Sequence, residues 1–324
     1  MRYQRAELHN HTTESDGAMT VEELLEYAEE RAFSHVALTD HNTCSGWSKA
    51  EKLLSQSESK LQLVRGIEFT TFYGHLIGLG AEEMIRFEEL DPSQPEIFLR
   101  KIKTEAKAKA VGIAHPFCVG EPVMVGCRCG LQITDWSCVD YLEVFNTSAG
   151  TSSFGNLLVG NAFAFALWKK LVLQGKSVAA VTGKDIHRKQ PEEPVFITWL
   201  LCPEEESERE QTGEERVIEA ILDQRTIVTK GPRFFCKKDV DGVRLYFDHT
   251  SNYFDWAKKA KEITMLLRLT ESDGTEKTME ISAGTDWVMI ADELEEPIVV
   301  ELFEGECQFE QLLAAGVFHG RNVQ

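Results

Sequence analysis

The sequence is short of long apolar segments and of positive charge. No run approaches the roughly 18 consecutive apolar residues that a membrane-spanning helix needs, and the start of the chain, Met1–Glu7, has no apolar signal region. Lys and Arg number 34 against 53 Asp and Glu, a net charge of −19. This balance argues against a protein that holds long nucleic acid on a basic surface. We therefore expect a cytoplasmic protein that acts away from membranes.

Low-complexity segments and internal repeats are also lacking. The 8 cysteines are scattered through a chain of 324 residues, which is typical of free thiols in a reducing compartment. Four of them share one segment: Cys118, Cys127, Cys129 and Cys138. They are numerous enough for a structural metal site but lack the Cys-x-x-Cys spacing typical of one. Ordinary reduced thiols are the simpler interpretation.

Strand-like and helix-like segments alternate over residues 1–232. Capping boxes at 20–23 and 93–96 predict two helices, the second reaching about residue 110, and a further helix is expected at 157–174. Short apolar strands are predicted between them, at residues 35–39, 61–64, 75–79, 111–114, 141–145 and 177–181. This alternation is typical of α/β proteins with a mostly parallel sheet, and the number of units favours a closed or nearly closed barrel.

The pattern changes towards the C-terminal end. A charged stretch at 204–215 predicts a surface loop, followed by a helix at 216–224. After Gly231-Pro232 helical periodicity mostly stops, and strands joined by turns are expected, at residues 242–247, 263–269, 278–281 and 298–302, with a hairpin turn at 272–274. We therefore expect two domains: a barrel over residues 1–232 and a small β-rich, sandwich-like domain over residues 233–324.

Side chains able to bind metal ions stand at the ends of the predicted strands. The set is His9, His11, Asp16, His41, Glu68, His75, His115, Asp185 and His187. A single histidine at a strand end is more often a structural residue than a ligand. However, 6 of the 9 histidines of the chain belong to this set, which chance placement explains poorly. Because barrel strands end at one rim, where active sites lie, the sequence predicts that these side chains converge.

The residue types in this set indicate divalent metal ions. His9 and His11 are two apart on an extended segment, so both imidazoles point to the same side. The two oxygens of Glu68 can bridge two ions. Nine ligands suit two or three ions, and mixed imidazole and carboxylate ligands suit Zn, Fe or Mn. The other histidines, at 35, 249 and 319, are assigned no role in a site.

As a set, these motifs resemble those of the PHP family, named for polymerase and histidinol phosphatase. The matching segments are His9-x-His11, Ser15-Asp16-Gly17, Leu38–Asn42, Gly66-Ile67-Glu68, Gly74-His75, Ala114-His115-Pro116 and Gly183–His187. The resemblance covers about residues 1–232 and implies a distorted (β/α)7 barrel with a trinuclear metal centre. It implies one ion on His9, His11, Glu68 and Asp185, a second on Glu68, His75 and His115, and a third on Asp16, His41 and His187.

The predicted C-terminal domain is absent from minimal phosphatases of this family. It resembles the appended sandwich of two-domain PHP metallohydrolases related to carbaryl hydrolase. This second resemblance does not change the expected metal centre, but it leaves several classes of substrate open.

The expected function is therefore metal-dependent hydrolysis. A hydroxide bridging two ions would attack a small anionic phosphomonoester or phosphodiester, nucleotide-like or a sugar phosphate, with Asp185 and His187 as candidate proton carriers. Candidate substrate contacts lie beside the ligands: Lys184, Arg188, Asn146 and Glu143. One alternative is hydrolysis of a carbamate, ester or amide at the same centre. The other is a metal-stabilised binding protein without catalysis, whose β domain is its partner surface.

Overall fold

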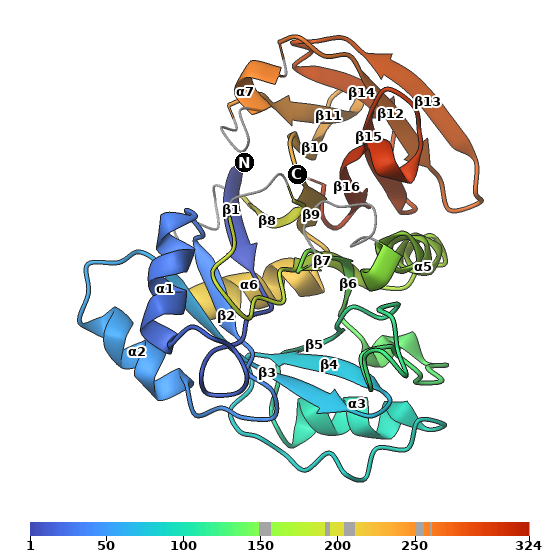
Figure 1. Ribbon diagram of the computed structural model, residues 1–324. Helices are drawn as coiled ribbons and strands as arrows, with labels where there is room; N and C mark the ends of the chain where they lie inside the picture. The colour runs from blue at the N-terminus through green and yellow to red at the C-terminus, as the bar shows by residue number, and fades with distance from the viewer. Residues whose placement is uncertain (149–156, 192–194, 204–210, 251–255, 260, 324) are drawn as a thin grey trace.

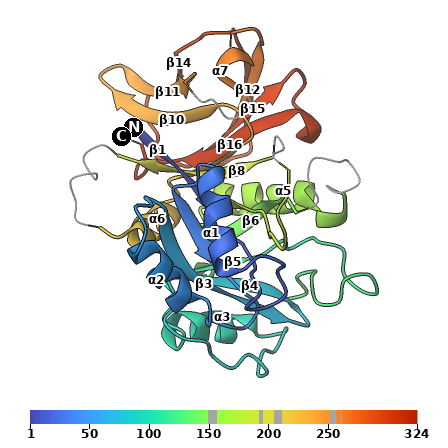
Figure 2. The same cartoon turned by 60° about the vertical axis from the view of Figure 1, so that its left-hand side comes forward.

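The computed structural model describes residues 1–148, 157–191, 195–203, 211–250, 256–259 and 261–323 (Figure 1). The protein is mixed α/β, as expected. One sheet of 13 strands runs through the chain, and a 3-stranded sheet packs on its C-terminal part. In Figures 1 and 2 the C-terminal strands, orange to red, stack above the N-terminal strands and helices. No helix in the described part is both long and apolar enough to cross a membrane.

The N-terminal part alternates strands with helices. Its strands are β1 (Arg2–Glu7), β2 (His35–Leu38), β3 (Gln62–Thr71), β4 (Gly74–Leu79), β5 (Ala110–Ile113), β6 (Tyr141–Asn146), β7 (Ala179–Gly183), β8 (Ile197–Cys202) and β9 (Thr226–Thr229). Its helices are α1 (Val21–Glu30), α2 (Trp47–Ser55), α3 (Pro95–Thr104), α5 (Asn161–Leu173) and α6 (Gly213–Leu222), with a 3₁₀ turn η1 (Trp136–Cys138). Every strand predicted here overlaps an observed one, whereas β8 and β9 were not predicted.

Strand pairing is mixed, which corrects the expectation of a mostly parallel sheet. The strands β1–β2–β3 and β5–β6–β7 pair in parallel, but β4 is antiparallel to both β3 and β5. Only Phe72 and Tyr73 separate β3 from β4, and two residues cannot form the crossover that parallel strands need. The start of β4 therefore lies beside the end of β3.

The N-terminal strands curl until β7 lies against β8 and β9. The contacts are made by threonine side chains: Thr182 donates its backbone N–H to Thr198 Oγ1 at 2.8 Å, and Thr226 Oγ1 donates to the carbonyl of Ala180 at 2.8 Å. Between β8 and β1 the ladder is antiparallel. The strand ends that carry the candidate ligands are thereby brought round towards one another.

The helix starts predicted from the sequence agree only in part with those in the structure. The capping box of α1 forms as predicted between Thr20 and Glu23. The box predicted at 93–96 does not form, because Glu96 instead accepts the backbone N–H of Asp135 at 3.0 Å, and α3 has no side-chain cap. The helices predicted at 157–174 and 216–224 overlap α5 and α6, and part of the predicted charged loop, residues 204–210, lies outside the described residues.

The C-terminal part is built of strands, most of them predicted. They are β10 (Arg233–Asp239), β11 (Gly242–Asp248), β12 (Met265–Thr270), β13 (Glu276–Ile281), β14 (Trp287–Ala291), β15 (Ile298–Glu304) and β16 (Leu312–Phe318), with α7 (Trp256–Lys259) and a 3₁₀ turn η4 (Phe309–Gln311). Strands β10, β11 and β14 form the small sheet, and β12, β13, β15 and β16 continue the large one. The strands β10, β14 and β16 were not predicted.

Strand β16 pairs with β9 and so joins the C-terminal strands to the N-terminal part. Alternate side chains of β15 enter two cores: Val299 and Phe303 pack with the N-terminal helices, whereas Val300 and Leu302 pack against the small sheet. The boundary predicted at residue 232 falls between β9 and β10, but this ladder crosses it. The division into two domains stays a prediction.

Candidate metal centre

The predicted ligands lie at one end of the curled strands. His9, His11 and Asp16 follow β1, His41 follows β2, Glu68 and His75 lie in the β3–β4 hairpin, His115 follows β5, and Asp185 and His187 follow β7. Each contacts at least one other member of the set. The sequence pattern thus identified side chains that the fold does bring together, and their role as ligands is taken up below.

Backbone pairing beyond the named strands holds the ligand-bearing segments. Asn10 forms a parallel bridge with Ile186, and His41 forms one with Glu68. Asp185 has φ 49° and His115 has φ 26°, a left-handed conformation that costs non-glycine residues about 1–3 kcal/mol. Strain of this kind, concentrated next to a cluster of polar side chains, is typical of a functional site.

Glu68 lies at the middle of the cluster and is fully buried. Its Oε1 is 2.9 Å from Nδ1 of His75 and 3.4 Å from Nε2 of His115. Its Oε2 is 3.3 Å from Nε2 of both His9 and His11. Nδ1 of His41 also lies 2.8 Å from Oε2, so one carboxylate faces imidazoles at both oxygens, which is the arrangement that a bridging ligand requires.

A second carboxylate, that of Asp185, lies beside the imidazoles of His9 and His11. Oδ1 of Asp185 is 3.1 Å from Nε2 of His11 and 3.5 Å from Nε2 of His9. The side chain of Asp185 is 17% exposed, whereas those of His9 and His11 are fully buried. It lies between the buried floor of the cluster and solvent.

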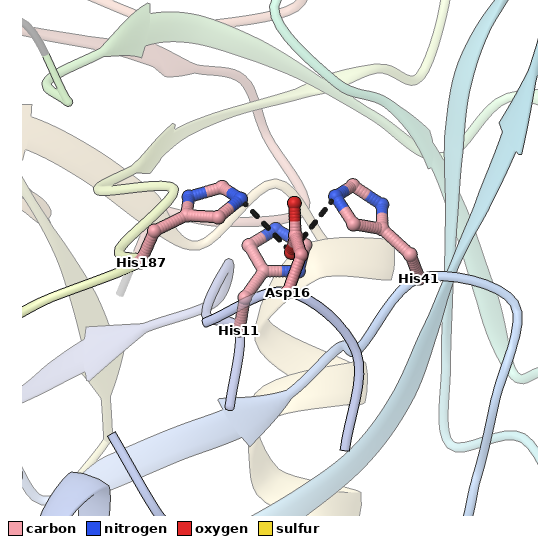
Figure 3. A group of neighbouring side chains, drawn as sticks. All are labelled: His11, Asp16, His41 and His187. Atoms are coloured by element: carbon pink, nitrogen blue, oxygen red, sulfur yellow. Dashed lines mark ion pairs between the residues drawn. The ribbon is translucent and has the colours of Figure 1, made fainter. Parts of the chain in front are cut away.

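Figure 3 shows the outer group, His11, Asp16, His41 and His187. Oδ1 of Asp16 is 3.3 Å from Nε2 of His187 and 3.5 Å from Nε2 of His41, with one ring on each side of the carboxylate. The ring of His11 stacks on those of His41 and His187 at 4.1 and 4.2 Å. Asp16 and His187 have side-chain exposures of 58% and 38%, so the cluster opens to solvent here.

Several buried atoms of the cluster make no hydrogen bond to any described residue. They are His9 Nε2, His11 Nδ1 and Nε2, Glu68 Oε2 and His75 Nε2. A buried polar atom without a partner costs about 1–3 kcal/mol, so such a concentration needs a compensating ligand. Imidazole nitrogens and carboxylate oxygens are donors that Zn, Fe and Mn accept. The residues present fit divalent metal ions.

The charges inside the cluster depend on one another. Burial raises the pKa of the Glu68 carboxyl, but His9 and His75 outweigh burial and hold that pKa well below its usual range. Burial lowers the pKa of His115, but the hydrogen bond with Glu68 and the charge of Asp185 raise it to about 9. The site thus favours the charged forms of Glu68 and His115, whereas burial lowers the pKa of His11.

Two of the four candidate substrate contacts are hydrogen-bonded to the candidate ligands, and their contact with substrate stays a prediction. Both oxygens of Glu143 are engaged, one 2.7 Å from His9 Nδ1 and the other accepting the backbone N–H of His115 at 2.9 Å. Asn146 donates its side-chain N–H to Asp185 Oδ2 at 3.1 Å and accepts from Ser148 through its oxygen. Both residues are buried.

The basic candidates differ from each other. Lys184 is buried, donates its backbone N–H to Glu7 Oε1 at 2.8 Å, and its positive charge lowers the pKa of Glu7 against the effect of burial. Its positive charge therefore acts on Glu7, and its contact with substrate stays a prediction. Arg188 is exposed directly after the last ligand, and its contact with substrate stays a prediction.

Sequence analysis missed Asp40, which precedes His41. Its carboxylate accepts the backbone N–H and the hydroxyl of Thr12 at 2.7 and 2.8 Å, and the hydroxyl of Ser15 at 2.7 Å. These bonds hold the loop that presents Asp16. The signal was available, because Asp40 stands at a strand end like the ligands themselves.

The four neighbouring cysteines do not form a metal site. All four are described and free, and the thiol of Cys138 donates to the carbonyl of Asp135 at 2.9 Å. In the described part of the chain, the groups of side chains close enough to share an ion contain no cysteine. The interpretation as reduced thiols agrees with this arrangement.

Comparison with known proteins adds a family and a fold. The PHP domain matches residues 7–113. The 5′-3′ exoribonuclease Rnm of Escherichia coli is 36% identical over 80 residues, which are 24% of this chain and 27% of that protein. The phosphoribosyl 1,2-cyclic phosphate 1,2-diphosphodiesterase of Eggerthella lenta is 37% identical over 83 residues, 24% of this chain and 31% of that protein. The chain therefore spans less than a third of the length of these curated relatives.

A solved structure covers nearly the whole chain. It is a two-domain protein from Bacteroides vulgatus described as containing a predicted PHP-like metal-dependent phosphoesterase. The match has a TM-score of 0.51 and 14% sequence identity, and covers 98% of this chain and 95% of the other. At this identity the likeness concerns the fold, which extends through both the N-terminal and the C-terminal parts.

Proposed function

This chain belongs to the PHP domain family, and we propose that it is a metal-dependent phosphoesterase acting on a small phosphomonoester or phosphodiester. The observation that carries the proposal is the convergence of nine ligand-type side chains, with the buried carboxylate of Glu68 at the middle of the cluster. Relatives named as an exoribonuclease and a cyclic phosphate diphosphodiesterase support phosphoester chemistry. Nucleotide-like compounds and sugar phosphates both fit, because nothing at the ligands themselves distinguishes them.

We propose three ions, Zn, Fe or Mn, held by the ligand groups that the family resemblance implies, within a distorted (β/α)7 barrel. The close groups in the structure are His11, Asp16, His41 and His187; His9, Glu68 and His115; and His9, His11 and Asp185. They overlap because His9 and His11 each belong to two of these groups. A cytoplasmic location and a β-rich accessory domain over residues 233–324, packed on the N-terminal part, remain part of this proposal.

Metal ions bound here would supply an activated water molecule and positive charge for the phosphoryl oxygens. The chain's own residues set the direction of approach. Glu68 and His9 are fully buried and form the floor, whereas Asp16, Asp185 and His187 have exposed side chains. His187 lies where a proton can pass between the site and solvent, and is the better candidate proton carrier.

The test combines metal analysis with turnover. Protein purified without chelator should contain two to three equivalents of transition metal and hydrolyse bis(p-nitrophenyl) phosphate or p-nitrophenyl phosphate with added Mn²⁺. The double variant His9→Ala, His11→Ala should lose bound metal and turnover together, because both imidazoles lie at the floor. The matched control is His249→Ala, since His249 lies on the C-terminal side, bonded to the carbonyl of Thr285.

The outcomes separate the competing functions. Metal without turnover of either phosphate ester would favour carbamate, ester or amide hydrolysis. Metal without turnover of any ester panel would indicate a metal-stabilised binding protein. Full activity in the double variant would contradict the proposal, because hydrolysis should be lost without the two buried imidazoles of His9 and His11.

A further inference from the structure

We infer that Glu143 positions two of the proposed ligands, His9 and His115, so that one carboxylate outside the ligand set controls how two ions are held. This inference rests on the proposed metal centre. Glu143 lies on β6 and is only 1% exposed, below the ligands and away from the opening. It is a positioning residue, since both of its contacts are to residues that face Glu68.

The first contact determines which nitrogen of His9 is available. Oε1 of Glu143 is 2.7 Å from Nδ1 of His9, and with a metal ion bound at this histidine Nδ1 would donate its N–H to the carboxylate. The lone pair is then on Nε2, the nitrogen that lies 3.3 Å from Glu68 and 3.5 Å from Asp185. An outer carboxylate of this kind fixes both the tautomer and the ring orientation of a metal-binding histidine.

The second contact acts on the backbone of another ligand. Oε2 of Glu143 accepts the N–H of His115 at 2.9 Å. His115 has φ 26°, a conformation that needs support from its surroundings. From there its Nε2 reaches within 3.4 Å of Oε1 of Glu68. Glu143 therefore joins a ligand at one oxygen of Glu68 to a ligand at the other.

An irregularity in β6 directs this strand at the site. The pairing register with β7 shifts between Glu143 and Phe145. In a regular strand, side chains three residues apart point to opposite faces. The bulge lets Glu143 and Asn146 both reach the ligands, and Asn146 donates to Asp185 Oδ2 at 3.1 Å. Strand β6 thus contacts three ligands without supplying one.

The neighbouring strand leaves room for the carboxylate. A Cβ atom added at Gly183, at the end of β7, would lie 2.2 Å from Oε1 of Glu143. Only glycine fits there while Glu143 keeps its place. The lack of a side chain at this position of β7 therefore leaves the Glu143 carboxylate free to bond the imidazole of His9.

The variant Glu143→Gln tests the inference directly. Glutamine keeps the shape but has a single acceptor oxygen, so it cannot accept from both His9 and His115. Competition with a chelator should show two ions bound about 10–100-fold more weakly, the range found for outer partners of metal ligands. The visible absorption of the Co²⁺-loaded protein should change as well. Asn146 bonds only Asp185 among the candidate ligands, so Asn146→Ala should weaken the binding of a single ion.

The matched control is Glu301→Gln on β15. Glu301 is equally buried, and its oxygens bind Arg268 and Lys169 outside the cluster. We expect it to lower the melting temperature but to leave metal affinity and the Co²⁺ spectrum unchanged. Wild-type protein without metal would overturn the proposed function. If the wild type binds metal and Glu143→Gln binds it with the same affinity, this inference alone is overturned. The same holds if Glu301→Gln loses as much metal affinity as Glu143→Gln.

Discussion

At the scale of single residues, the site shows how burial and partners decide what a histidine does. Most histidines of this chain face carboxylates, which favour their protonated form or a bound cation. His35 is the contrast, since it is 1% exposed and its ring nitrogens make no hydrogen bond to any described residue. The same residue type is therefore a ligand candidate in one place and a core residue in another.

His35 should make stability depend on pH. Burial, with smaller effects of Arg216 and Arg2, lowers its pKa from 6.5 to about 4. Between these values the unfolded chain binds a proton that the folded chain does not, so stability falls as pH drops through this window and is constant above it. The full effect is about 3 kcal/mol, from the shift of the pKa.

Urea unfolding of wild type and His35→Leu at pH 7, 6, 5 and 4 measures this effect. The other titrating groups are common to both proteins, so the difference between their unfolding free energies isolates His35. That difference should move in favour of the variant as the pH falls. Parallel pH profiles would contradict the assignment.

At the scale of elements, the ligands depend on loops that other residues hold. Asp16 is 58% exposed, so its place depends on the loop between β1 and α1. That loop is closed at Gly17, where a Cβ would lie 2.4 Å from the carbonyl oxygen of His11. The three hydrogen bonds accepted by Asp40 anchor its other side. The position of Asp16 in the outer group of Figure 3 therefore depends on this loop.

Removing the anchor should release the outer group. Asp40→Ala leaves the donors of Thr12 and Ser15 unpaired, and we expect the ion at Asp16 to bind about 10–100-fold more weakly. Chelator competition measures this, with Asp91→Ala as the control, because Asp91 holds Ser93 by the same kind of turn on the surface. Equal metal affinity in both variants would show that the loop needs no anchor.

Much at this scale was accessible from sequence. Apolar runs located ten strands, and a capping box located the start of α1 at Thr20. The second capping box was wrong because Glu96 had a better partner far along the chain. Strand β16 was missed because Leu312–Phe318 is rich in small residues and does not alternate polar with apolar side chains. Local pattern predicts an element well only where its partners do not override it.

At the scale of the whole molecule, the C-terminal strands complete the sheet that carries the site. Besides the β9–β16 ladder, Phe309 stacks on Phe145 at 5.6 Å, and Lys169 of α5 lies 2.7 Å from Glu301 of β15. Phe145 belongs to β6, the strand that holds the ligands in position. The C-terminal part therefore supports the strand behind the site.

Removal of residues 233–324 should accordingly prevent stable folding of the remainder. Strand β9 would keep β8 but lose its second partner, β16, and Val299, Phe303 and Val317 would leave the N-terminal core. We expect the full chain to melt in one transition, and residues 1–232 alone to bind a hydrophobic dye and to aggregate. Size-exclusion chromatography and circular dichroism check this. A monomeric truncated protein that still binds metal would show that the two parts fold separately.

By itself the sequence identified the candidate ligands and their order along the chain, because a polar side chain at the end of an apolar strand is a local pattern. It also located the strands that correspond to β3 and β4, although the turn of two residues that makes their pairing antiparallel is seen only in the structure. Only the tertiary structure decided that Glu143 and Asn146 are hydrogen-bonded to the candidate ligands and that β16 returns to β9. Such pairings depend on a bulge, on packing and on chain closure over long distances, none of which leaves a periodic trace in the sequence.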